Sequence, residues 1–186
     1  MPLRCIEGLD TRPTTDRIKE TLFNMLQPEI PGCRFLDLFG GSGAIGIEAL
    51  SRGADFAAFA ENNRKAYDCI SDNLVFTKLD DRARVFFMDA LGALRVLEGE
   101  EPFDIIFLDP PYAYDAMAVL GMAAGLVERG VAAPDAIVVY EHSLAGNDAA
   151  ALAAAELGFE LASRKKYGDT TVDVLRAGER AAFDND

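Results

Sequence analysis

Short apolar runs alternate with helix-length amphipathic segments along most of this chain, and this alternation constrains the fold more than any other feature. It is typical of βαβ units, in which parallel strands form a sheet that helices cover on both faces. The expected parallel strands are Phe35–Phe39, Phe56–Ala60, Arg84–Met88, Ile105–Leu108 and Ile137–Tyr140. The expected helices are Asp16–Leu26, with Thr14 and Thr15 as caps, and Ala44–Arg52, Arg64–Phe76, Ala90–Leu97, Ala116–Arg129 and Asp148–Leu157.

The end of the chain departs from this pattern. Two strand-like runs, Phe159–Lys166 and Thr171–Arg176, flank the turn signal Tyr167-Gly168-Asp169-Thr170, which predicts an antiparallel hairpin. The sequence therefore predicts an α/β fold with a mostly parallel seven-stranded sheet. At 186 residues we expect one domain, with an N-terminal segment and helix over 1–30, a core over 31–176 and a tail over 177–186.

Composition narrows the class of protein. The chain has no apolar stretch of about 18 residues and no signal-peptide pattern at its start, so we expect a cytoplasmic protein that does not span a membrane. Its formal net charge of −13 argues against a wide basic face that coats nucleic acid. Cys5, Cys33 and Cys69 are widely spaced and His142 is the single histidine, so no metal site is expected.

A glycine-rich loop follows the first expected strand. Residues 41–46 match G-x-G-x-x-G between a strand and a helix, and Glu61 ends the next strand, 20 residues after Gly41. This context is typical of a nucleotide-type site, although a purely structural tight turn would fit too. Asp37, Glu61, Asp89 and Asp109 all stand at the carboxyl ends of expected strands. They would repel a pyrophosphate and attract a sulfonium, which favours S-adenosylmethionine over a dinucleotide.

The fourth expected strand runs into Asp109-Pro110-Pro111-Tyr112. Prolines fix φ and stiffen this corner. The Asp109 carboxylate and the Pro110 carbonyl could accept both N–H bonds of an exocyclic amine and direct its lone pair at a methyl group, while a base stacks on Tyr112. The alternative is a loop in which Asp109 caps the next helix.

These motifs resemble those of a known family. "TRPTTDRIKETLFNML" (11–26), "FLDLFGGSGAIGIEALSRGA" (35–54), "FDIIFLDPPY" (103–112), "YEHS" (140–143) and "KKYGDT" (165–170) are similar to segments of the bacterial 16S ribosomal RNA guanine-N2 methyltransferases that modify guanine 966. The resemblance covers roughly residues 8 to 176. It implies a Rossmann-like class I methyltransferase that uses S-adenosylmethionine, with 16S RNA in the small ribosomal subunit or an assembly intermediate as its partner.

The resemblance also implies site residues. The cofactor would contact Asp37, Phe39, Gly40, Gly41, Ser42, Gly43, Glu61, Asn62, Asp89 and Ala90. The target guanine would be held by Asp109, Pro110, Pro111 and Tyr112. Substrate RNA would contact Arg12, Thr14, Arg17, Arg164, Lys165 and Lys166. Gly40 stands where the family usually has alanine, which a turn should tolerate, and His142 is interpreted as a hydrogen-bonded structural histidine rather than a catalytic one.

Other functions stay open at this point. A DNA adenine or cytosine amino-methyltransferase would use a similar corner, but such enzymes usually add a target-recognition domain. A nicotinamide-dependent dehydrogenase would need a proton donor that the sequence does not supply convincingly, and a non-catalytic binding module would not need Asp109 and Tyr112. Family members typically begin with a short basic hairpin, and because only Arg4 precedes Arg12 here, we expect weak RNA binding from a chain without it.

Overall fold

A computed structural model describes Leu3 and residues 13–111 and 114–178, with side chains from residue 16 onward in the first helix. Two compact units make up the chain, residues 1–93 and residues 94–186. No helix in these described ranges is both long and apolar enough to cross a membrane. The prediction of a single domain stays a prediction.

The first unit consists of a three-stranded parallel sheet and its helices. Its helices are α1 (Pro13–Leu26), α2 (Ala44–Ser51) and α3 (Arg64–Phe76), with 3₁₀ turns η1 (Gln27–Glu29) and η2 (Asp80–Arg82). Its strands are β1 (Arg34–Asp37), β2 (Phe56–Glu61) and β3 (Ala83–Phe87). β2 lies between the other two, parallel to both, with Phe35 opposite Ala57 and Phe59 opposite Val85.

Local chemistry explains where these helices begin. α3 begins after Asn63, whose side chain accepts a hydrogen bond from Ala66 N at 3.1 Å. α1 begins at Pro13 rather than at the expected Asp16, because proline is well suited to the first helical position. Thr14 and Thr15 therefore lie inside the helix and do not precede it as caps.

The fully buried side chains of this unit include Phe23, Phe35, Phe59 and Ile70. Each stabilises the fold by about 1.5–3 kcal/mol because it is removed from water.

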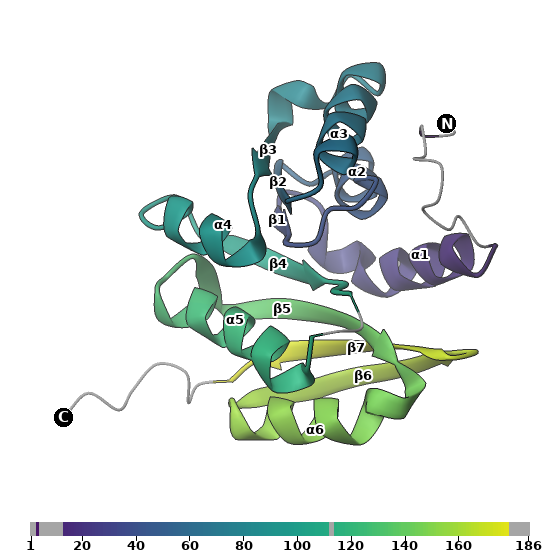
Figure 1. Cartoon of the computed structure of the whole chain (residues 1–186), viewed down its shortest axis with the longest axis vertical. Helices are drawn as coiled ribbons and strands as arrows, with labels where there is room; N and C mark the ends of the chain where they lie inside the picture. The colour runs from purple at the N-terminus through teal and green to yellow at the C-terminus, as the bar shows by residue number, and fades with distance from the viewer. Residues whose placement is uncertain (1–2, 4–12, 112–113, 179–186) are drawn as a thin grey trace. The chain divides into compact units, whose positions relative to one another are not determined.

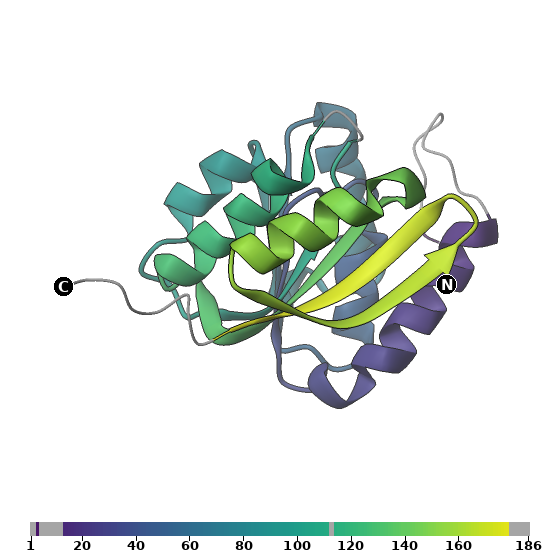
Figure 2. The ribbon, with the colours of Figure 1, turned by 90° about the horizontal axis from the view of Figure 1, so that it is seen from below.

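The second unit carries the rest of the sheet. Its strands are β4 (Phe103–Leu108), β5 (Ala132–Ser143), β6 (Phe159–Tyr167) and β7 (Thr170–Ala177). The other elements are α4 (Ala90–Val96), which begins in the first unit, α5 (Ala116–Glu128), the 3₁₀ turn η3 (Leu144–Gly146) and α6 (Asn147–Glu156). β5 is parallel to β4 and antiparallel to β7, and β6 pairs with β7 as the predicted hairpin (Figure 1). α5 and α6 lie side by side over one face of these strands (Figure 2).

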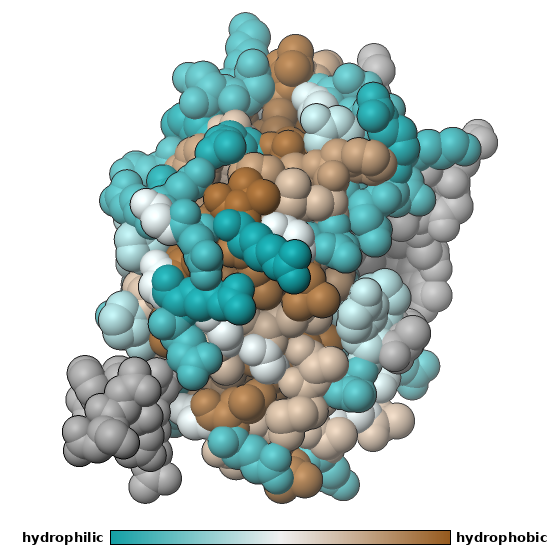
Figure 3. Space-filling view, turned by 60° about the vertical axis from the view of Figure 1, so that its left-hand side comes forward, coloured by the Kyte–Doolittle hydropathy of each residue, from teal (hydrophilic) through white to brown (hydrophobic). Residues whose placement is uncertain are grey.

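The seven strands follow the order β3-β2-β1-β4-β5-β7-β6 in one mixed sheet. This confirms the predicted α/β class with its antiparallel C-terminal hairpin. On the face that Figure 3 shows, apolar patches lie between and beneath charged side chains. Large apolar side chains that stay exposed include Val75, Phe76, Leu91 and Val96.

Candidate active site

The glycine loop connects β1 to α2 through a tight backbone turn. Gly40 N donates to Ala60 O at 3.0 Å, and Gly43 N donates to Gly40 O at 2.8 Å. Gly41 and Gly43 have φ values of 57° and 82°, a region that side-chain-bearing residues rarely adopt. Gly43 is also the N-cap residue of α2. The loop thus presents bare backbone at the start of a helix, where a ligand can approach closely.

Glu61, at the end of β2, ties this loop to the sheet. Its Oε2 accepts a hydrogen bond from Gly41 N at 2.8 Å, and its Oε1 accepts one from Asn63 N at 3.0 Å. Each carboxylate oxygen can accept a second hydrogen bond, so a ribose diol could still bind here. Glu61 therefore shapes the glycine turn as well as offering an acceptor, a role that the sequence pattern did not predict.

Asn73 of α3 is a further support for the loop, and the sequence analysis missed it. Its side chain is fully buried, and its Nδ2 donates to Ser42 O at 3.1 Å and contacts Cys69 Sγ at 3.5 Å. A polar residue among the buried positions of an amphipathic helix was the available signal. A buried amide needs a hydrogen-bond partner, and here that partner is the glycine loop.

The other predicted cofactor residues of the first unit lie at or just after the ends of β1, β2 and β3. Asp37 is buried at 1 % exposure, and its Oδ1 accepts from Phe39 N at 3.3 Å. Asp89 is exposed and its Oδ1 accepts from Gly92 N at 2.7 Å, so it caps α4. Asn62 is exposed, whereas Ala90 is buried at the start of α4.

In the second unit, β4 leads from the buried Leu108 directly into Asp109, Pro110 and Pro111. Pro111 O accepts from Tyr114 N at 3.1 Å, while Pro110 O accepts no hydrogen bond from the residues that the structure describes. Asp115 rather than Asp109 caps the next helix, since its Oδ1 accepts from Ala118 N at 2.8 Å. Asp109 is thus not used as a helix cap. Tyr112 lies outside the described residues.

Two carboxyl groups near this corner have raised pKa values. Asp109 is exposed as a residue, but desolvation of its carboxyl group raises its pKa to about 6. Burial, followed by the negative charge of Asp109, raises the pKa of Glu141 to about 8. Perturbed carboxyl groups of this kind are common at functional sites. Glu141 stands within the segment YEHS (140–143), but the sequence pattern predicted no role for it.

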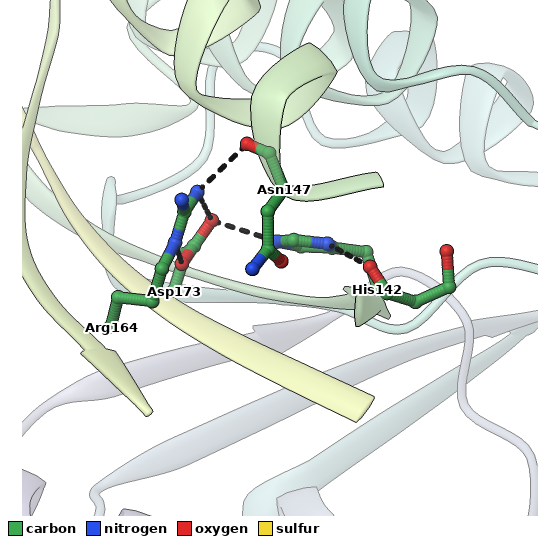
Figure 4. A network of polar contacts seen from close by, with 5 residues as sticks. His142, Asn147, Arg164 and Asp173 are labelled. Carbon is green, nitrogen blue, oxygen red and sulfur yellow. Dashed lines mark hydrogen bonds and ion pairs between the residues drawn. The ribbon is translucent and has the colours of Figure 1, made fainter. Parts of the chain in front are cut away.

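His142, the next residue on β5, belongs to a buried polar network (Figure 4). Its Nε2 lies 2.8 Å from Asp173 Oδ2, and its Nδ1 lies 2.9 Å from Ser143 O. Arg164 donates from Nε and Nη2 to the two Asp173 oxygens at 2.7 and 2.9 Å, and from Nη2 to Asn147 O at 3.1 Å. Burial raises the pKa of Asp173, but the hydrogen bonds and charges of Arg164 and His142 outweigh it, so that the pKa is lowered. His142 is therefore hydrogen-bonded as predicted, and its structural rather than catalytic role stays a prediction.

The residues predicted to contact RNA lie in different environments. Arg12 and the side chain of Thr14 fall outside the described residues, and Arg17 is exposed on α1. Lys165 and Lys166 are exposed on β6. Arg164 is engaged by Asp173, so its charge stabilises the hairpin and is less available to a phosphate than the neighbouring lysines.

Comparisons with known proteins agree with the fold. The family model described as Conserved hypothetical protein 95 matches residues 1–176. A protein named Ribosomal RNA small subunit methyltransferase D from Haemophilus influenzae is 37% identical over 142 residues, which are 76% of this chain and 72% of the relative. Its namesake from Escherichia coli strain K12 is 33% identical over 172 residues, 87% and 84% of the two chains. The solved Escherichia coli protein yhhF has 33% identity and a TM-score of 0.75, covering 95% of this chain and 91% of that one.

Proposed function

This chain belongs to the family described as Conserved hypothetical protein 95, and from this membership we propose that it methylates the exocyclic N2 of a guanine in 16S ribosomal RNA. The methyl donor would be S-adenosylmethionine. One observation carries the proposal: Asp109 and its two prolines directly follow a buried strand, in a chain whose relatives are named small-subunit ribosomal RNA methyltransferases.

The first unit would bind the cofactor. S-adenosylmethionine supplies an electrophilic methyl group on a positively charged sulfur. The glycine turn offers close backbone approach, Glu61 offers carboxylate lone pairs for a ribose diol, and Asp37 and Asp89 add negative charge at the ends of β1 and β3. This set of acceptors fits a cationic ligand without phosphates better than a pyrophosphate, which the carboxylates would repel.

The corner after β4 would hold the amine. The nitrogen of an exocyclic amine is a poor nucleophile because its lone pair is conjugated with the base. Two acceptors, the Asp109 carboxylate and the Pro110 carbonyl, would engage its two N–H bonds and leave the lone pair available to attack a methyl carbon. The cofactor would supply the methyl carbon, so that the N–C bond would form while the C–S bond breaks and leaves its electron pair on sulfur. Positioning and fixed dipoles therefore account for the catalysis.

The substrate would be a base within folded RNA. A guanine must leave its stack before its amine can enter such a corner, and Tyr112 is proposed to stack on it. The names of the relatives support small-subunit ribosomal RNA over DNA as the substrate. An encounter with such a substrate would take place in the cytoplasm.

Replacing Asp109 tests this assignment of roles. Asp109→Ala should lower methyl transfer to small-subunit particles by at least about 100-fold, because the amine loses its charged acceptor. Calorimetry should give a cofactor Kd within about twofold of the wild-type value, since Asp109 is assigned to the amine. Asp135→Ala, which removes an exposed carboxylate of β5, is the matched control. Loss of cofactor binding in Asp109→Ala would move this residue into the cofactor site and defeat the assignment.

A further inference from the structure

Asp109 directly follows the last residue of β4, and Glu141 is the neighbouring position on the adjacent strand β5. The parallel pairing of β4 with β5 sets Leu108 opposite Tyr140, and Asp109 and Glu141 are the next residue on each chain. Residues in register on adjacent strands point to the same face, successive residues alternate, and strands lie about 4.8 Å apart. The two carboxyl side chains therefore leave the same face of the sheet within reach of each other.

Glu141 is anchored more firmly than Asp109. β5 continues beyond its last pair with β4 and stays paired with β7, where Glu141 lies opposite Val172 and His142 opposite Thr171. His142 points to the other face, where it contacts Asp173, which in turn is bound by Arg164 (Figure 4). Asp109, in contrast, follows the last residue of β4. A fixed Glu141 is thus well placed to orient Asp109.

The two groups titrate as a pair. Burial raises the pKa of Asp109 to about 6, and burial and the Asp109 charge raise that of Glu141 to about 8. Between these values the pair holds one proton, mainly on Glu141, and one negative charge, mainly on Asp109. On the other face, burial and the charges of Asp173 and Asp115 raise the pKa of Tyr140, which packs against His142 of the His142–Asp173–Arg164 network.

We infer that Glu141 is a positioning residue that donates a hydrogen bond from its protonated carboxyl group to Asp109 and so directs the second Asp109 oxygen at the substrate amine. This inference rests on the proposed function. Methyl transfer leaves a positive charge and one surplus proton on the amine nitrogen. That proton passes to the Asp109 carboxylate, so the pair ends with both groups neutral. When Glu141 is ionised, the two carboxylates repel each other and the alignment is lost.

The pH dependence of kcat/KM, measured with small-subunit particles, tests this role. The wild-type profile should rise near pH 6 as Asp109 ionises and fall near pH 8 as Glu141 loses its proton. Glu141→Gln keeps an N–H donor that cannot ionise, so it should retain activity within about threefold at pH 7 and lose the alkaline fall. Glu141→Ala should lower kcat by about tenfold or more with cofactor Kd within about twofold. Asp135→Asn and Asp135→Ala are the matched controls.

A merely structural role gives a different pattern. The inference would be overturned if Glu141→Gln and Glu141→Ala lost activity in step with a fall in melting temperature. It would also have to be the case that kcat/KM of these variants still falls at alkaline pH as in the wild type. Infrared difference spectra supply a readout that needs no catalysis, since wild-type protein at pH 7 should show a protonated-carboxyl band that Glu141→Gln lacks. Absence of this band also overturns the inference. A wild-type protein that shows the band and transfers no methyl group refutes the proposed function itself, together with any role in catalysis.

Discussion

At the scale of single residues, Glu61 has two tasks in the first unit. It accepts hydrogen bonds from Gly41 N and Asn63 N, and it is also proposed to accept from the cofactor's ribose. Glu61→Ala should therefore raise the cofactor Kd by about tenfold, because one hydrogen bond to a charged acceptor contributes about 1.5–3 kcal/mol and part of this is regained from water. Calorimetry measures the change, with Asp72→Ala, which removes an exposed carboxylate of α3, as the control. An unchanged Kd would remove Glu61 from the cofactor site.

Individual residues also mark the limit of sequence reasoning. A short stretch of sequence is enough to predict the roles of Asp109, Glu61 and the loop glycines. Each of them stands at the end of an apolar run or in a known motif spacing. Asn73 and Glu141 carry no such signal. Their roles depend on a buried contact across 31 residues in one case and on the register between β4 and β5 in the other. Contacts of this kind follow from the packed fold and not from local pattern.

At the scale of elements, the close packing of α2 on β2 depends on the third glycine of the loop motif. A Cβ on Gly46 would overlap the ring of Phe59, which is fully buried. Gly46→Ala should therefore lower stability by about 1–3 kcal/mol or more through overpacking. Gly40→Ala is the matched comparison, because its Cβ would meet the end of the Ile70 side chain at 2.8 Å, and that methyl group can move.

Denaturant titration of the two variants measures the difference in unfolding free energy. We expect Gly40→Ala to lower the free energy of unfolding clearly less than Gly46→Ala, in line with the expectation that a turn tolerates alanine at position 40. Equal losses of stability in the two variants would show that close packing of α2 on β2 does not depend on a glycine at position 46.

The β6–β7 hairpin depends on Asp173, which is 2 % exposed and binds both Arg164 and His142. Because the pKa of Asp173 is lowered in the folded protein, its contribution to stability is present above the ordinary aspartate value and is lost as pH falls through the lowered one. Asp173→Asn should lower the free energy of unfolding by about 3–5 kcal/mol at pH 7, since it removes the buried negative charge that Arg164 and His142 bind. The difference in unfolding free energy between wild type and Asp173→Asn should become smaller below about pH 4. If this difference does not depend on pH, the Asp173 charge does not stabilise the hairpin in the way described.

Element boundaries were predictable where one pattern dominates. α3 has the predicted bounds, Arg64–Phe76, because an amphipathic run follows a capping asparagine. β5 is much longer than the expected Ile137–Tyr140. Pro134 and Asp135 interrupt the apolar pattern at one end, and at the other end pairing with β7 extends the strand to Ser143. Where a strand ends depends on its pairing with neighbouring strands, and this pairing cannot be predicted from the strand's own sequence.

At the scale of the whole molecule, the net charge of −13 limits how the chain can meet RNA. Exposed Lys165 and Lys166 on β6 are the best-described candidates for phosphate contact. Reversing both charges with K165E and K166E should weaken binding to small-subunit particles and lower the slope of log K against log salt by about 1.5, since each phosphate contact contributes about 0.7–0.9. Filter binding at several salt concentrations measures the slope. K78E with R95E, two exposed cations elsewhere, is the control, and equal slopes would show that the RNA surface lies elsewhere.

The acidic balance of the molecule also suggests what form the substrate takes. Ribosomal proteins are generally basic, so an acidic enzyme would bind an assembled or partly assembled subunit better than bare RNA. Comparable methyl transfer to bare 16S RNA and to particles would count against this hypothesis.

Identification of the methylated nucleoside tests the central claim most directly. Small-subunit particles from a strain lacking this modification are incubated with labelled S-adenosylmethionine, digested and separated by mass-resolved chromatography. The account predicts that wild-type protein produces labelled N2-methylguanosine and that Asp109→Ala, which should still bind the cofactor, produces almost none. Label in methylated adenine or cytosine of a DNA substrate, with none in N2-methylguanosine of the ribosomal RNA, would contradict it.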